Sequence, residues 1–233
     1  MFRSPSGFRV SIQAATVTLI ALTALPFANA QTTRRGYETN AARQARIARQ
    51  VQETYTHRWE VAGGGGYLRF RSGEFTQKNS EIAFWANTSY YFNQKLGVTG
   101  EIRGAYGNGK VLEGNPYAAL VGNPQISEYP FLAGPTYRFY LHQKIAISAF
   151  ALGGTAIGKF DGDSKGIAAP LLGFWPSTNA APAVSLGGNL DLNLYPNFAF
   201  RIAPSYLGTS FGSSWQNNAG FEMGLVYRFG RQK

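Results

Sequence analysis

The sequence predicts an all-β fold, an eight-stranded antiparallel up-and-down transmembrane β-barrel with a short N-terminal helix. Three observations predict it. Apolar and polar residues alternate over segments of about ten residues, tight turns alternate with long loops, and the only long apolar block lies at the start of the chain. The chain is 44% hydrophobic but only 15% charged. Its apolar residues are therefore dispersed along strands rather than collected in spanning helices.

Residues 1–30 are predicted to be a cleaved signal peptide. Arg3 and Arg9 precede the apolar stretch "VSIQAATVTLIALTALPF", and Ala28-Asn29-Ala30 has the small-x-small pattern of a cleavage site. Pro26 and the polar residues near the end of this stretch argue against a retained membrane anchor. Cysteine is absent, so an exported chain would have no disulfide bonds.

Residues 31–57 are predicted to form a basic leader that precedes the barrel. The stretch from Asn40 is rich in alanine, arginine and glutamine, with Arg43, Arg46 and Arg49 at every third position. This composition favours a short helix, which could lie against anionic lipid headgroups or peptidoglycan. A solvated leader without fixed structure is the alternative.

Eight strands are predicted between residues 58 and 229. Tight turns "NQK" at 93–95, "HQK" at 142–144 and "YPN" at 195–197 each join two strands, while long loops lie near 108–126 and 158–180. The expected strands are 58–70, 81–92, 96–107, 128–141, 145–157, 183–194, 198–208 and 218–229. An even number of strands with short turns at one end and long loops at the other is typical of a transmembrane barrel. Residues 230–233 then form a C-terminal extension.

The first strand does not keep one alternation. Trp59 and Val61 share one parity, whereas Leu68 and Phe70 share the other. A β-bulge within 63–66, where four glycines follow one another, would bring all four side chains to the same face.

The two faces of the other strands differ in polarity. One face carries only apolar residues, such as Leu96, Val98 and Ile102, and the other carries charges. A soluble barrel could not bury those charges in its core at an acceptable desolvation cost, so the charged face is predicted to line the lumen and the apolar face to meet lipid. Aromatic residues near the strand ends are expected to form interfacial girdles, namely Tyr91, Phe92, Phe139, Tyr140, Tyr195, Phe198, Tyr227 and Phe229.

Four acids and four arginines are predicted to form a charge network in the lumen. Pairing across the turns places Asp191 opposite Arg201, and Trp85 opposite Arg103. An eight-stranded lumen is just wide enough for side chains to fill it. The network could therefore plug the barrel, or it could gate a narrow ion path through an exchange of salt bridges. Its members are Glu60, Glu101, Arg103, Arg138, Asp191, Arg201, Glu222 and Arg228.

Over residues 58–229 the chain resembles the small eight-stranded outer-membrane barrels, the OmpA transmembrane-domain, OmpX and OmpW group. Glu222-x-Gly224-x-x-Tyr227-x-Phe229 resembles the β-signal in the last strand of such proteins, which the outer-membrane barrel assembly machinery reads. In this chain residues 230–233 follow the final aromatic residue. The resemblance implies a monomer in the outer membrane of a Gram-negative-type envelope, in contact with lipopolysaccharide, with the helix and the short turns on the periplasmic side.

Neither a catalytic nor a metal site is predicted. His57 and His142 both lie at the short-turn end, and no Ser-His-acid set can be assembled, so an enzyme that modifies outer-leaflet lipid is the least favoured function. Asp161 and Asp163 begin a calcium-like loop, but Lys165 occupies a ligand position, so we expect no metal and no cofactor. No nucleic-acid partner is expected.

The apolar run 167–175 is unusual for a free loop. It is expected either to fold over the mouth of the barrel or to bind an external partner. The predicted function is a structural role in the envelope or a surface interaction made by the loops, with a narrow gated pore for ions or small solutes as the alternative.

Overall fold

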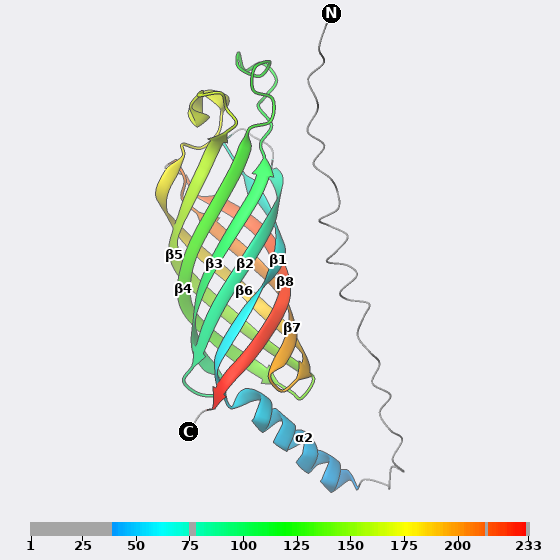
Figure 1. Cartoon of the computed structure of the whole chain (residues 1–233). Helices are drawn as coiled ribbons and strands as arrows, with labels where there is room; N and C mark the ends of the chain where they lie inside the picture. Colours follow the sequence, from blue (N-terminus) through cyan, green and yellow to red (C-terminus); the bar gives the residue numbers. More distant parts are fainter. Residues whose placement is uncertain (1–38, 75–77, 213, 232–233) are drawn as a thin grey trace, which may run out of the picture. The chain divides into compact units, whose positions relative to one another are not determined.

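The computed structural model describes residues 39–74, 78–212 and 214–231 (Figure 1). One helix, α2 (Asn40–Tyr55), precedes eight strands, and a short 3₁₀ helix, η1 (Ala169–Leu172), lies between the fifth and the sixth. The strands are β1 (His57–Arg71), β2 (Lys78–Tyr91), β3 (Leu96–Asn108), β4 (Gln125–Leu141), β5 (Ile145–Gly162), β6 (Thr178–Tyr195), β7 (Phe198–Thr209) and β8 (Gln216–Arg231). The predicted signal peptide lies outside the described residues.

The strands form a closed barrel in chain order, and every neighbouring pair is antiparallel, including the β1–β8 pair that closes it. The predicted eight-stranded up-and-down barrel is therefore confirmed, as is a helix within the leader. The largest difference is at β5 and β6, which extend about five residues beyond their predicted ends. In the described part of the chain, no helix is both long and apolar enough to cross a membrane.

The outward face of the barrel is apolar and exposed. Ile82, Phe131, Leu186 and Leu225 all project from the barrel, and Ile82 is 79% exposed. A water-soluble domain would leave this continuous band in contact with water, whereas hydrocarbon solvates it without cost. The closed ladder leaves no unpaired strand edge, which is the condition for a sheet to cross a bilayer.

The predicted bulge in the first strand is wrong. β1 pairs with β2 and with β8 without a register shift from Trp59 to Arg69, so the alternation continues through all four glycines. Leu68 and Phe70 consequently face the interior, where both are buried. The glycines have a different role, because a Cβ atom added to Gly64 would lie 2.1 Å from the backbone oxygen of Met223. Glycine at this position allows a close approach of the β1 and β8 backbones at the closing seam.

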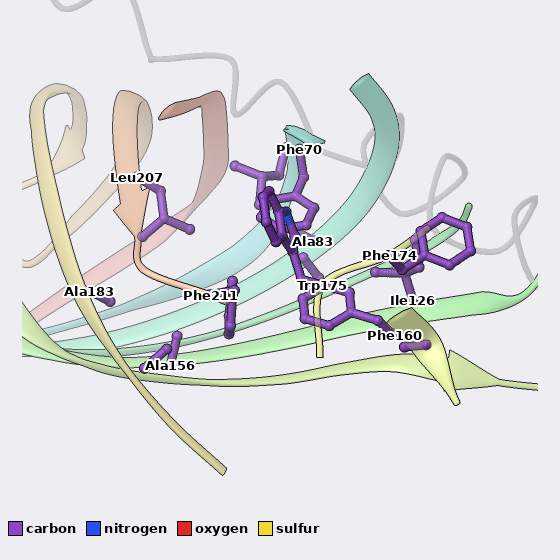
Figure 2. Close-up of a cluster of buried hydrophobic side chains, with 14 of the residues drawn as sticks. Phe70, Ala83, Ile126, Ala156, Phe160, Phe174, Trp175, Ala183, Leu207 and Phe211 are labelled. Carbon is purple, nitrogen blue, oxygen red and sulfur yellow. The ribbon is translucent and has the colours of Figure 1, made fainter. Parts of the chain in front are cut away.

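The interior is divided into a charged part and an apolar part. Towards the long loops, buried strand residues such as Leu68, Leu152 and Leu207 pack with loop residues such as Leu172 into one hydrophobic core. Figure 2 shows this core, which includes Phe70, Phe160 and Phe211. The centroids of these three rings lie 5.0–6.2 Å from one another. The charged face was predicted to line the lumen, but at the long-loop end the lumen is apolar, because the long loops exclude water there and make an apolar filling favourable.

Candidate functional site in the barrel lumen

Five of the eight predicted lumen charges meet near the short-turn end. Glu60 accepts from the guanidinium groups of Arg138 at 2.7 Å, Arg201 at 2.5 Å and Arg228 at 2.9 Å. Asp191 accepts from Arg201 at 2.6 Å and from Arg228 at 2.8 Å. These residues, which we call the inner charge cluster, come from β1, β4, β6, β7 and β8 and are almost completely buried. Such a cluster fixes the relative positions of five strands across the lumen.

Two tyrosines close the inner charge cluster on the side of the short turns. The guanidinium of Arg138 lies over the ring of Tyr91, with Cζ 3.4 Å from the ring centroid, and 5.5 Å from the ring of Tyr55. Tyr91 was expected in the interfacial girdle, but it is only 1% exposed and faces the lumen. This expectation is wrong because Tyr91 has the inward parity of β2, and only its position near a strand end suggested a girdle.

Tyr55 attaches the end of α2 to the short turns. Its hydroxyl donates to the backbone oxygen of His142 at 2.8 Å and accepts from Asn193 Nδ2 at 2.8 Å. Burial raises the pKa of the Tyr55 hydroxyl above its usual value, against the opposing effects of the Asn193 hydrogen bond and of Arg228 and Arg138. The chain therefore places an ordered aromatic side chain beneath the lumen, directly before β1 begins.

The other three predicted charges form a second group farther along the lumen, which we call the middle charge cluster. Arg103 Nε contacts Glu101 Oε1 at 2.6 Å and Glu222 Oε1 at 2.9 Å. Its two terminal nitrogens donate to the hydroxyl oxygens of Ser205 at 3.1 Å and Ser185 at 3.0 Å. The three guanidinium nitrogens of Arg103 thus bring side chains from β3, β6, β7 and β8 together.

Sequence reasoning missed two acids in the lumen, Glu81 and Glu128. Both are fully buried, and none of their carboxyl oxygens has a hydrogen-bond partner among the described residues. The two acids lie next to the apolar core, since Ala105 of that core pairs with Glu128. The alternation of apolar and polar residues does assign both acids to the inward face. Each is, however, the first residue of a predicted strand, where the alternation is a weak guide to which way a side chain points.

The run 167–175 folds into the mouth of the barrel, which confirms the first of its two expected arrangements. Ala169, Leu172 and Phe174 are buried in the apolar core, and the Trp175 indole N–H donates to the backbone oxygen of Arg71 at 2.9 Å. The backbone N–H of Trp175 also donates to the backbone oxygen of Ser72 at 2.8 Å. The long-loop end is therefore closed by the chain itself.

The remaining predicted site residues lie apart from these clusters. Gly224 is paired with Gly64 at the closing seam, and Tyr227 and Phe229 project outward from the end of β8. His57 Nδ1 lies 3.1 Å from the Thr54 oxygen, and His142 lies in the turn after β4. No group of three or more metal-ligating side chains occurs within the part of the chain that the structure describes.

Solved structures share this fold. Ail, the attachment invasion locus protein of Yersinia pestis, is 18% identical over 74% of this chain and 99% of its own, with a TM-score of 0.48. Neisserial surface protein A is 10% identical over 73% of this chain and 97% of its own, with a TM-score of 0.50. OprG of Pseudomonas aeruginosa is 12% identical over 75% of this chain and 97% of its own, with a TM-score of 0.48. No protein-family model and no curated protein sequence matches the chain. The fold is that of the small eight-stranded outer-membrane β-barrels.

Proposed function

We propose that this protein is a closed outer-membrane barrel that serves the envelope structurally or through its surface loops, and that it does not conduct solutes. The observation that carries the proposal is the double closure of the lumen. Two clusters of buried charges fill the inner and middle parts, and an apolar core that includes Phe174 and Trp175 fills the outer part. An ion crossing such a lumen would have to displace both ionic and apolar packing.

We also propose a cellular location for the protein and a route for its assembly into the membrane. The exposed apolar band supports insertion in a bilayer, and the fold supports the outer membrane of a Gram-negative-type envelope with lipopolysaccharide in its outer leaflet. The segment from Glu222 to Phe229 would serve as the β-signal for the assembly machinery, after export by the signal peptide. The basic helix α2 would lie on the periplasmic side, near headgroups or peptidoglycan.

We also propose that the protein is not an enzyme. His57 and His142 both lie at the short-turn end, far along the barrel from the long loops. A lipid-modifying enzyme of the outer leaflet needs its nucleophile and base near the opposite end.

Deletion of the gene from its host tests the proposal. We expect the protein in the outer-membrane fraction, and we expect its loss to raise sensitivity to detergents while the uptake of small solutes stays unchanged. Restoration of detergent resistance by the wild-type chain would support an envelope role. A fall in small-solute uptake with unchanged envelope resistance would contradict it.

A gated pore is the second candidate, and the geometry of Arg103 favours it. Because Nε of Arg103 is shared between Glu101 and Glu222, the side chain could shift from one carboxylate to the other without losing all of its charge pairing. This candidate predicts ion conductance that changes when Arg103 is replaced by glutamate.

A further inference from the structure

A groove at the long-loop end combines cationic and aromatic side chains. It has a volume of about 300 Å³, and its lining includes Arg71, Glu74, Lys78, Trp175, Trp215 and Asn217. We call it the rim groove. It lies where the end of β1, the start of β2 and the start of β8 meet, and it is separate from the charge clusters of the lumen.

Among the residues that the structure describes, the cations of the rim groove have no ionic partner. Arg71 and Lys78 lie directly opposite each other in the β1–β2 ladder, on the outward face. Like charges at such positions repel each other, unless an anion lies between them. Arg69 lies two residues away on the same face, and no described carboxylate forms an ion pair with any of the three cations. Glu74 is the one acid among the described lining residues, so the site retains a net positive charge.

The two indole rings of the rim groove are held in place by hydrogen bonds. The Trp215 N–H donates to the Tyr206 hydroxyl at 3.0 Å, and the ring covers Gly208, where an added Cβ would lie 2.3 Å from the ring carbon Cζ2. Part of Trp215 remains accessible, since the residue is 46% exposed. Trp175 is tied to the Arg71 and Ser72 backbone. Rigid rings bind a ligand with little loss of conformational entropy.

We propose that the rim groove binds a phosphorylated or sulfated saccharide. Arginine and lysine hold phosphate and sulfate oxygens through charge-assisted hydrogen bonds. The C–H face of a sugar ring packs on an exposed indole, and side-chain amides such as that of Asn217 hydrogen-bond sugar hydroxyls. The volume suits a small unit of such a ligand. Two sources carry this chemistry, namely the phosphorylated saccharide of an outer-leaflet lipid and a soluble sulfated glycan.

The test is a binding titration of the mature chain in phospholipid nanodiscs, followed by tryptophan fluorescence. The soluble probes are dextran sulfate and neutral dextran of equal length. The lipid probes are nanodiscs that contain rough lipopolysaccharide before and after enzymatic removal of its phosphates. We expect dextran sulfate, phosphorylated lipopolysaccharide or both to bind, which identifies the source, and we expect the neutral forms not to bind.

Two double variants that each remove two positive charges distinguish binding at the rim groove from nonspecific electrostatic attraction of the probe to the protein. Arg71→Gln with Lys78→Gln should weaken binding about tenfold or more, because two charge-assisted contacts are lost. Lys110→Gln with Lys165→Gln, at exposed positions in other loops, should change it less than about twofold. Trp215→Leu should weaken binding without reducing its salt dependence. Each variant must first show the urea unfolding midpoint of the wild type.

Three results would overturn the inference: no binding of either anionic probe, equal binding of the neutral forms, or equal losses in the groove and control variants. The inference rests on the proposed placement of the long loops outside the cell. Binding is measured on purified protein, so its failure would leave the proposal of a closed lumen intact.

Discussion

Glu60 in the first strand lies directly opposite Arg228 in the last strand, and Arg228 Nε donates to Glu60 Oε2 at 2.9 Å. This pair spans the seam at which the barrel closes. Because Glu60 also accepts from Arg138 and Arg201, one carboxylate connects β1 with three other strands. The ends of the transmembrane chain are therefore joined through a group that cannot be removed without leaving buried charge.

Replacement of Glu60 by glutamine is expected to lower the free energy of unfolding by about 3–5 kcal/mol, because three buried arginines lose a shared counterion. Urea unfolding of the refolded protein in detergent measures the change. Glu113→Gln is the control, since its ion pair with Lys110 is exposed and should contribute almost nothing. An unchanged unfolding midpoint for the Glu60 variant would show that the inner charge cluster does not stabilise the closed barrel.

Replacement of Glu128 by leucine is expected to raise the free energy of unfolding by about 1–3 kcal/mol. Its carboxyl group is buried and has no hydrogen-bond partner in the described part of the chain, so removing it abolishes a desolvation cost and extends the apolar core. The matched variant Glu101→Leu should do the opposite, because Glu101 is paired with Arg103. Destabilisation by Glu128→Leu, measured by the same urea unfolding, would indicate that Glu128 has a favourable partner.

Replacement of Gly64 by alanine is expected to hinder closure of the barrel. The new methyl group would meet the Met223 backbone oxygen, whereas Gly100, also in a strand, has no atom within 4 Å of an added Cβ. The folded yield after refolding into detergent should fall for Gly64→Ala and stay at the wild-type level for Gly100→Ala. Equal yields for the two variants would show that the β1–β8 seam adjusts to a side chain at this position.

Replacement of Tyr55 by phenylalanine is expected to lower the free energy of unfolding by about 1 kcal/mol at neutral pH, because the backbone oxygen of His142 and the amide of Asn193 lose a hydrogen-bond partner. The cost should depend on pH. Because burial raises the pKa of Tyr55, the neutral hydroxyl stabilises the fold fully below the unfolded pKa of about 10, and this stabilisation is lost as pH rises through the folded pKa. The difference in unfolding midpoint between wild type and variant should therefore shrink above pH 10. A difference that stays constant up to pH 12 would contradict the buried position of this hydroxyl.

The sequence predicted the barrel because period-two alternation and turn spacing are repeated in every hairpin, so errors at single residues do not change the topology. Pairing across a tight turn likewise places Asp191 opposite Arg201. The outer part of the lumen was not predictable in this way. Leu68 and Phe70 face inward because the alternation of β1 continues through its glycines. Their surroundings are apolar because residues 167–175, about a hundred positions later in the chain, fold into the same space. Alternation reports which residues share a face, but it does not report what fills the space beside that face.

The most direct test of the closed lumen is single-channel recording across a planar bilayer with refolded protein that begins at residue 31. We predict that wild-type protein, shown to be folded in the same preparation, gives no discrete openings. Discrete openings whose size or frequency changes in Arg103→Glu would contradict the closed lumen and establish the gated pore instead.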